Sequence, residues 1–259
     1  MKRYTLFILC IIGLLWFIFK ASKTTVPMLT TLPNIPSILP SERNVAEPLN
    51  YIVNGETFSF SWFAVDQTDS IKLIPNFTKQ TSSISVAQEN KCTFLSSAGF
   101  YSTDSKPIGL FVIDNKQLSP YQPNALLNGF LSVNSMGIAS IETKPPPGTS
   151  TIVLQSGPLL IVGGLPQQLA IRNDEPARRI VVVETSNHKI VFLVLYSLEN
   201  TFEGPKLTDV PNHLKEIEKN IHISIIHALN LDGGSASAFI TPTVSITELT
   251  PVGSFFCIQ

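Results

Sequence analysis

Residues 225–237 read IIHALNLDGGSAS, an apolar run that ends in an acidic turn with two glycines. An apolar run of this length is typical of a buried strand. Paired glycines let the backbone adopt φ angles that other residues avoid, and they let a ligand approach the chain closely. The stretch therefore predicts a strand end where Asp232 and the hydroxyls after it can hold a polar diester or sugar. The alternative is a tight Asx-type turn in which Asp232 bonds local amides.

Strand patterns also dominate the residues before this stretch. Between Thr57 and Phe63, apolar residues alternate with polar neighbours, as in a half-buried strand. Further strands are predicted at 109–113, 129–133, 137–141, 180–184 and 190–196.

One clear helix is predicted over residues 209–220. Thr208 can cap it, Pro211 falls in its first turn, and an apolar stripe follows helical spacing at Val210, Leu214, Ile217 and Ile221. Together these elements predict an α+β fold, a single strand-rich domain with a mixed or antiparallel sheet and a few flanking helices, preceded by an N-terminal hydrophobic helix.

The first 48 residues differ from the rest in composition. A basic start, Met1-Lys2-Arg3, precedes an uncharged apolar run from Tyr4 to Phe19 that is typical of a targeting segment. As a helix this run spans roughly 24 Å at ~1.5 Å per residue, so it crosses a ~30 Å hydrocarbon core only if the flanking lysines and arginine reach the interface. Residues 24–48 are rich in Pro and Thr, as in an extended linker.

We therefore predict a signal anchor or signal peptide over 1–23, a linker over 24–48 and one globular domain over 49–259. The localisation expected from this arrangement is extracytoplasmic. The protein would be membrane-anchored, in the periplasm or at the cell surface, or secreted if the N-terminal segment is cleaved.

Composition narrows the class of protein. Hydrophobic residues make up 44% of the 259 residues and charged residues 14%, unlike a disordered chain. The net charge is −1 and no long run of Lys or Arg occurs, so no nucleic-acid partner is expected. The four histidines form no H-E-x-x-H pattern, and neither zinc spacing of cysteines nor a phosphate loop is present. No metal or cofactor is therefore predicted, and the oligomeric state is left open.

Two of the three cysteines, Cys92 and Cys257, fall in the predicted domain. A disulfide between them is possible in an oxidising compartment, and two buried thiols are the alternative.

Two further segments carry polar groups next to apolar strands. The pair Gln155-Ser156 interrupts an apolar stretch, and Arg178-Arg179 opens the predicted strand at 180–184. Arginine suits a phosphate because its planar group donates two parallel hydrogen bonds. The alternatives are a loop at the core edge for the first pair and a solvated strand end for the second.

Taken in order, these segments resemble the phosphodiester glycosidase family. Ser97-Ala98-Gly99-Phe100-Tyr101 resembles the family's N-A-G-F-F segment, and residues 106–110 (KPIGL) resemble its K-P-x-G-L. Residues 155–158 (QSGP) are similar to its Q-S-G-P, Arg178 falls where an Arg opens a strand, and 228–234 (ALNLDGG) is nearly its A-L-N-L-D-G-G. The resemblance covers the chain from about Phe58 to the end.

This resemblance implies an exported hydrolase that cleaves a sugar phosphodiester on an envelope or extracellular glycan. It implies Asp232 and Arg178 as catalytic residues, with Arg178 neutralising the phosphate and Asp232 acting as acid, base or orienting group. The substrate-binding residues that it implies are Ser156, Gln155, Gly99, Phe100, Gly233, Gly234, Ser235, Arg179 and Asn230. The expected partners are this substrate and, through the N-terminal segment, a membrane.

The sequence departs from the family at several positions. Ser97 stands where the family has Asn, which removes an amide that both donates and accepts. The residues after Arg178 also differ, so Arg179 and Arg172 are alternatives for its role. Glycoside cleavage commonly uses two carboxylates, and the candidates for the second are Glu142, Asp104 and Asp114.

Two rival functions are considered, and these departures favour the first of them. The first is a non-catalytic domain of the same fold that binds a glycan or sugar phosphate. The second is a serine hydrolase that uses Ser235 or Ser156, although no histidine is tied to either by the sequence.

Overall fold

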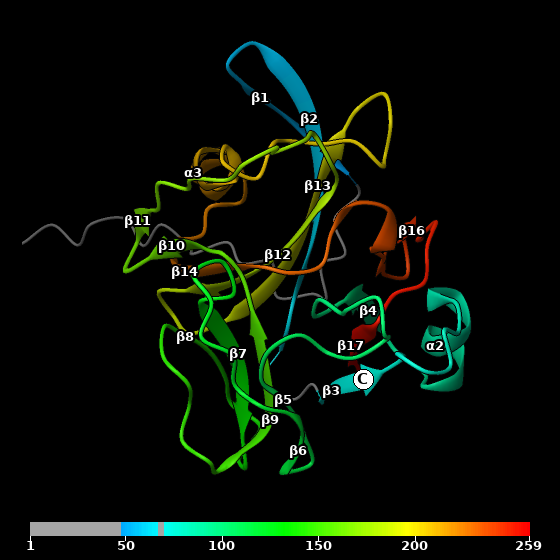
Figure 1. The fold of residues 1–259 in the computed structure, drawn as a ribbon. Coiled ribbons are helices and arrows are strands. Elements are labelled where there is room, and N and C mark those ends of the chain that lie inside the picture. The colour runs from blue at the N-terminus through cyan, green and yellow to red at the C-terminus, as the bar shows by residue number, and fades with distance from the viewer. Residues whose placement is uncertain (1–47, 67–69) are drawn as a thin grey trace, which may run out of the picture. The chain divides into compact units, whose positions relative to one another are not determined.

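The computed structural model describes residues 48–66 and 70–259, all of which belong to one compact unit. The strands form three sheets, two of which join segments far apart in the sequence, while the third is built within residues 111–156 (Figure 1). Every paired strand in the three sheets runs antiparallel to its neighbours.

The largest sheet has seven strands in the order β1-β2-β13-β12-β14-β10-β11. They are β1 (Leu49–Val53), β2 (Glu56–Ala64), β13 (Ile190–Ser197), β12 (Arg179–Thr185), β14 (Ile225–Asn230), β10 (Leu159–Val162) and β11 (Leu165–Pro166). β14 lies between β12 and β10, with Asn230 opposite Val181 and Leu229 opposite Leu159. The strand that leads to Asp232 therefore has a partner on each side.

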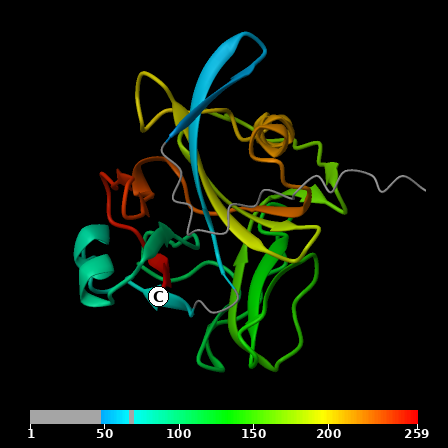
Figure 2. The same ribbon diagram turned by 180° about the vertical axis from the view of Figure 1, so that it is seen from behind.

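Two five-stranded sheets complete the described part of the fold. One has the order β16 (Ser245–Ile246), β15 (Phe239–Ile240), β4 (Phe94–Ser97), β17 (Ser254–Ile258) and β3 (Ile71–Pro75). The other has the order β6 (Lys116–Ser119), β5 (Phe111–Ile113), β9 (Ser150–Ser156), β7 (Gly129–Asn134) and β8 (Ala139–Glu142). Seen from behind, Figure 2 shows the long strands β2, β13 and β12 side by side, as their pairing requires.

The main core contains buried side chains from all three sheets. Phe63 of β2 stacks on Phe94 of β4 with ring centroids 4.5 Å apart, and Phe192 of β13 packs on the same Phe94 at 5.0 Å. Strand β12 explains why residues 180–183 form a continuous apolar run. Ile180 and Val182 belong to this core, whereas Val181 and Val183 belong to a second cluster on the opposite face of the sheet.

The helices are α2 (Ser83–Glu89), α3 (Val210–Ile221) and the short 3₁₀ turn η1 (Gly234–Ala236). α3 covers the second cluster with Val210, Leu214 and Ile217, so the predicted stripe is confirmed. The predicted cap is wrong, because Asp209 is the N-cap and makes no side-chain capping bond. Thr208 instead bonds the side chain of Asp174, to which its backbone N–H donates at 2.8 Å.

The predicted α+β class is wrong. Strands account for 41% and helices for 11% of the described residues, and the sheets are curled and antiparallel. The physical reason is that α3 covers one face of one sheet, while the main core is built where the three sheets pack on one another. The seven strands predicted from pattern, including the apolar run that begins at residue 225, each overlap an observed strand.

Cys92 and Cys257 form a disulfide, with Cα atoms 5.4 Å apart and 165 positions apart in the sequence. Of the two alternatives that the sequence left open, the structure has the disulfide. Because Cys257 lies on β17 and Cys92 just before β4, the bond joins the C-terminal strand to the segment that leads into the candidate site.

The predicted signal segment at 1–23, with its hydrophobic helix, lies outside the described residues, as do residues 24–47 of the predicted linker. Between 48 and 66 and from 70 onward, no helix is both long and apolar enough to span a membrane.

Candidate functional site

Asp232 lies two residues after the end of β14, and its backbone is hydrogen-bonded to residues at the end of β4. Its backbone N–H donates to the carbonyl of Ala98 at 2.9 Å, and the Ser97 hydroxyl donates to the carbonyl of Asp232 at 2.7 Å. The serine that replaces the family's Asn thus holds the backbone of Asp232. These bonds join two segments that are 135 positions apart in the sequence.

The carboxyl group of Asp232 is buried without a cation. The residue is 8% exposed, and no ion pair to it occurs within the described ranges. Burial raises its pKa from 3.8 to about 8, and a hydrogen bond from the backbone of Gly233 opposes that rise only in part. At neutral pH the carboxyl group is therefore mostly protonated and can donate a proton.

Tyr101 is a member of this site that the sequence did not single out. Its pKa is raised by burial and, second, by the negative charge of Asp232, so the two side chains are within electrostatic reach. The phenol donates to the carbonyl of Pro251, and its ring lies against Gly253, where a Cβ would come within 2.5 Å of Tyr101 Cδ1. The available signal was its place two residues after Gly99 in the segment resembling N-A-G-F-F.

The two glycines after Asp232 are required by close contacts and backbone shape. A Cβ at Gly233 would lie 2.6 Å from the carbonyl oxygen of Arg178, and Gly234 has φ +64°. The N–H of Gly234 donates to the same Arg178 carbonyl at 2.8 Å. The turn that begins η1 is therefore built directly against the residue before β12.

Arg178 holds this turn with its side chain as well. The residue is 0% exposed, its Nε donates to Ser237 Oγ at 2.8 Å, and its Nη2 donates to the carbonyls of Ser237, Thr247 and Gly234 at 2.5, 3.1 and 3.2 Å. Burial lowers its pKa to about 10, and Glu248 opposes that shift. Its guanidinium thus contacts protein carbonyls and the ring of Phe202, 4.8 Å from the ring centroid.

Arg179 lies apart from these groups. Its Nη2 donates to Asp174 at 3.3 Å and to the carbonyl of Glu175 at 2.6 Å, and its Nε donates to the carbonyl of Pro205 at 3.0 Å. The third arginine considered from sequence, Arg172, is exposed. The structure therefore brings Asp232 together with Arg178 through the turn and leaves the other two arginines outside it.

Ser156 and Asn230 meet beside the end of β14. The Ser156 hydroxyl donates to the carbonyl of Asn230 at 2.7 Å, and Asn230 Nδ2 donates to the carbonyl of Gly157 at 3.0 Å. The other side-chain atom, Asn230 Oδ1, is buried and has no hydrogen-bond partner in the part of the chain that is described. A buried acceptor of this kind suits a hydroxyl or amide donor of a ligand.

The side chain of Gln155 forms hydrogen bonds with the backbone of two loops. Its Oε1 accepts from the N–H groups of Leu110 and Gln122 at 2.8 and 3.1 Å, and its Nε2 donates to the carbonyls of Gln122 and Leu127 at 2.6 and 2.7 Å. The residue is 0% exposed, so it positions the loops 107–110 and 119–127 from inside.

The other predicted binding residues lie in the same neighbourhood. Gly99 is buried, where a Cβ would lie 2.5 Å from Leu154 Cδ1, and Phe100 is partly exposed beside it. Ser235 is exposed on η1, and its carbonyl accepts from the N–H groups of Leu249 and Thr250. The structure thus places Gly99, Phe100 and Ser235 on segments joined to Asp232, whereas the side chain of Gln155 bonds residues 110, 122 and 127 and Arg179 lies apart.

No second carboxylate is paired with Asp232 among the described residues. The side chain of Glu142 accepts from Ser132 and Ser140, and Asp104 and Asp114 lie in exposed turns. The hydroxyls of Ser156 and Ser235 contact no histidine in the same ranges. Across residues 48–66 and 70–259, no three His, Cys, Asp or Glu side chains gather closely enough to hold a metal ion.

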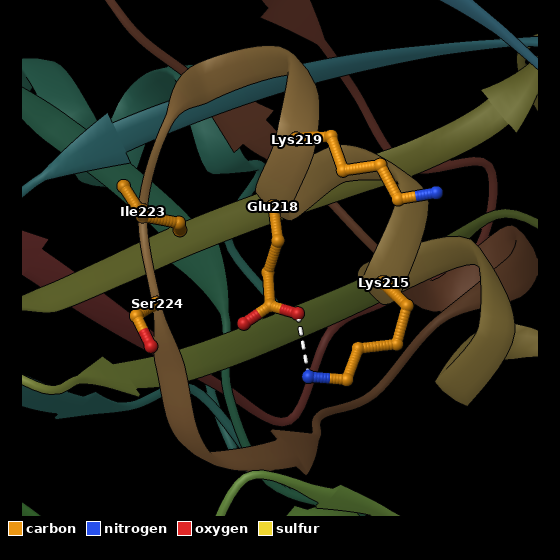
Figure 3. Close-up of a pocket in the computed structure, with 5 residues that line it drawn as sticks. All are labelled: Lys215, Glu218, Lys219, Ile223 and Ser224. Carbon is orange, nitrogen blue, oxygen red and sulfur yellow. Dashed lines mark hydrogen bonds and ion pairs between the residues drawn. The ribbon is translucent and has the colours of Figure 1, made fainter.

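A hollow at the C-terminal end of α3 has its charges already paired. It is lined by Lys215, Glu218, Lys219, Ile223 and Ser224 (Figure 3). Lys215 Nζ lies 2.6 Å from Glu218 Oε2, Glu218 Oε1 accepts from the N–H of Ile225 at 2.6 Å, and Lys219 pairs with Glu216 at 2.7 Å. These contacts join α3 to β14. They also give each charged side chain of the hollow an ionic partner, so the hollow is not a candidate ligand site.

Similarity to a known family covers most of the described domain. The family model described as phosphodiester glycosidase matches residues 90–258. No curated protein matches the chain.

Solved structures share the fold at low identity. The zebrafish N-acetylglucosamine-1-phosphodiester α-N-acetylglucosaminidase catalytic domain, auto-inhibited by its pro-peptide, matches with TM-score 0.64 and 13% identity over 84% of this chain and 83% of that one. A hypothetical protein from Synechocystis matches with TM-score 0.63 and 12% identity over 82% of this chain and 61% of that one. A candidate exported protein from Burkholderia pseudomallei matches with TM-score 0.51 and 10% identity over 79% and 74%.

Proposed function

The chain belongs to the phosphodiester glycosidase family, and from this premise we propose that it is a hydrolase that cleaves the glycosidic bond of a sugar phosphodiester. The observation that carries the proposal is the buried carboxyl group of Asp232, whose pKa of about 8 keeps it protonated at neutral pH. A carboxyl group in this state can give its proton to a leaving oxygen.

In the proposed reaction Asp232 acts as the proton donor. The bond between the anomeric carbon and the bridging oxygen breaks, and that oxygen leaves with the phosphate and takes the proton of Asp232. The oxygen of a water molecule bonds to the anomeric carbon, and the proton that the water loses restores the acid form of Asp232. An anionic phosphodiester favours this role, because a nearby negative charge raises the pKa of a carboxyl group further.

Other residues around the turn support substrate binding. Asn230 Oδ1 is a buried acceptor without a partner in the described part, and we assign it to a hydroxyl or amide of the sugar. Arg178 is proposed as a positioning residue, because its donors hold the backbone of the turn that presents Asp232. This role differs from phosphate neutralisation, which the family resemblance implied.

We also propose that the protein works outside the cytoplasm. The apolar segment at 4–19 and the basic residues before it are typical of export, and the Cys92–Cys257 disulfide suits an oxidising compartment. Membrane attachment through the same segment is part of this proposal, as is the division into 1–23, 24–48 and 49–259.

A non-catalytic domain that binds a glycan or sugar phosphate is the alternative. The observation that favours it is the missing second carboxylate, since in the described ranges Glu142 bonds Ser132 and Ser140 while Asp104 and Asp114 lie in exposed turns. Such a domain would bind the same ligand without turnover.

The test is release of sugar from an α-N-acetylglucosaminyl phosphodiester by the full chain. This sugar is chosen because the zebrafish protein of the same fold is named for it. We expect hydrolysis by the native protein and a loss of about 10²- to 10⁴-fold in Asp232→Asn, the usual contribution of a general acid.

Asp114→Asn is the matched control, because Asp114 lies in an exposed turn with φ +50°, which asparagine tolerates. This variant should keep full activity. Tight binding without release of sugar by the native protein would support the binding domain, and full activity in folded Asp232→Asn would remove Asp232 from the reaction.

A further inference from the structure

A hollow of about 430 Å³ lies between the loop after β4 and the loop after β6. Polar and apolar side chains share its lining. They are Ser102, Lys106, Pro107, Ile108, Leu118, Ser119, Pro120 and Gln122.

This hollow adjoins the candidate site through Tyr101. Tyr101 pairs with Pro107 as an isolated bridge, and the N–H of Ser102 donates to the carbonyl of Lys106 at 2.9 Å. The turn that forms one wall of the hollow is therefore the direct continuation of the residue that responds to the charge of Asp232. Asp232 is bonded to the same segment, because its backbone N–H donates to the carbonyl of Ala98, three residues before Tyr101, at 2.9 Å.

Both walls are fixed from inside by Gln155. It bonds the N–H of Leu110 behind one wall, and it bonds both the N–H and the carbonyl of Gln122 in the other. Gly109 has φ +85°, and a Cβ there would lie 2.7 Å from Gln155 Oε1, so the first wall lies directly on the glutamine. Gln155 thus supports both walls of the hollow.

Lys106 is the one charged residue in the lining, and within residues 48–66 and 70–259 its ammonium group has no acidic partner. In the hollow beside α3, by contrast, each lysine is paired with a glutamate. The hydroxyl of Ser102 lies beside Lys106, whose N–H it accepts at 3.4 Å, and it keeps its own hydrogen for donation. An ammonium group without an acidic partner and a hydroxyl donor in the same lining suit the oxygens of a phosphate.

The rest of the lining selects for an uncharged group. Pro107, Ile108, Leu118 and Pro120 present apolar surface, while Ser119 and Gln122 add polar atoms. A polyol or sugar ring has both a carbon face and hydroxyl groups, so it matches such a lining. Since the guanidinium of Arg178 is buried and bonded to carbonyls, Lys106 is the cation available to the phosphate on this side.

We propose that this hollow is the subsite for the phosphate and the alcohol esterified to it, with Lys106 contacting the phosphate and the alcohol a neutral polyol or sugar. The proposal rests on the proposed function and extends it to the part of the substrate that leaves. It gives a specificity role to Lys106, the first residue of the KPIGL segment, which has no part in the proposed reaction at Asp232.

The first test compares a charged and an uncharged substrate of the full chain. For the methyl ester of α-N-acetylglucosaminyl phosphate, Lys106→Gln should raise KM about three- to ten-fold and change kcat by less than about two-fold, as for one exposed charge contact. For 4-nitrophenyl α-N-acetylglucosaminide, which has no phosphate, both parameters should stay unchanged. Lys116→Gln, with the same charge change on nearby β6 but outside the lining, should match the native protein on both substrates.

The second test does not need turnover. Glycerophosphoglycerol, a stable phosphodiester of two polyols, is titrated with the native protein, and broadening of its ³¹P NMR line is followed. Native protein and Lys116→Gln should broaden the line, and Lys106→Gln should do so at least about three-fold less.

The two proposals fail in different ways. If the native protein hydrolyses neither substrate yet Lys106→Gln loses ³¹P broadening, the hydrolase proposal fails and the subsite stands. If Lys106→Gln equals the native protein in both the KM for the diester and ³¹P broadening, the subsite is overturned whatever the activity.

Discussion

Arg178 and Arg179 are consecutive residues with opposite surroundings, and the same holds for the aspartates near them. Arg179 pairs with Asp174 at 3.3 Å, and Asp174 also accepts from the N–H groups of Thr208 and Leu207 at 2.8 and 3.0 Å. Burial raises the pKa of Asp174, but these amides and Arg179 outweigh it, so its pKa lies below the ordinary value. At the other place Arg178 bonds carbonyls, and burial raises the pKa of the unpaired Asp232 to about 8.

The difference distinguishes ionised groups that stabilise the fold from the Asp232 carboxyl group, which the proposed reaction uses. The Asp174 carboxylate is ionised and satisfied where it orders the segment before α3. The Asp232 carboxyl keeps its proton because burial disfavours its charged form, while the guanidinium of Arg178 bonds carbonyls of the turn and not this carboxyl. A pairing of Arg178 with Asp232 would lower the pKa of that carboxyl and remove the proposed proton donor.

The largest effect should come from removing the two arginines in turn. Arg178→Met should lower the free energy of unfolding by about 3–5 kcal/mol, because it leaves several buried carbonyls without donors. Arg179→Met should cost less, about 1–2 kcal/mol, since the hydrogen bonds that it loses to Asp174, Glu175 and Pro205 are part-buried or exposed. Urea denaturation of both variants measures the two losses in the free energy of unfolding. Equal losses would contradict the contrast between the two arginines.

The two aspartates should respond with opposite signs. Asp232→Asn should raise the free energy of unfolding at pH 7 by about 2–4 kcal/mol, because folding no longer has to protonate a group that is ionised when unfolded. Asp174→Asn should lower it by about 1–2 kcal/mol through loss of charge-assisted bonds. Denaturation of both variants at pH 7 checks the signs, and destabilisation by Asp232→Asn would show that its carboxylate is stabilised in the fold.

The change in the free energy of unfolding for each pH unit is a smaller effect. A folded pKa raised from 3.8 to about 8 means that the native state binds more protons than the unfolded state between those values, so stability falls as pH rises through that range. The contribution of Asp232 is up to ~1.4 kcal/mol per pH unit. Subtracting the unfolding curves of Asp232→Asn from those of the native protein isolates it, and identical slopes would contradict the raised pKa.

The strands that the sequence predicted are those with a readable pattern. The alternation at 57–63 and the apolar run at 190–196 correspond to β2 and β13, which pair with one another. β4 and β17 were not predicted, since each is short and buried on both faces, so their sequences show no alternation. The fold class failed for a related reason, because no local pattern shows that sheets pack mainly on one another.

The sequence predicted which residues form the candidate site better than it predicted what each of them does. Asp232, Gly233, Gly234, Ser156 and Asn230 were named from sequence and meet around one strand end. The direction of the Arg178 side chain was not readable, because it depends on carbonyls from residues 201, 234, 237 and 247 that the sequence does not mark. Tyr101 and Lys106 were within quoted motifs, but their neighbours appear only in three dimensions.

The pH dependence of kcat/KM for the phosphodiester tests the role of Asp232 most directly, because it reports the protonation state that the unliganded protein needs. The diester itself does not titrate between pH 5 and 9. If protonated Asp232 is the proton donor, kcat/KM is level from pH 5 to 7 and falls about ten-fold per unit above pH 8. A kcat/KM that rises through this range would mean that the ionised carboxylate is required, and Asp232 would then not be the proton donor.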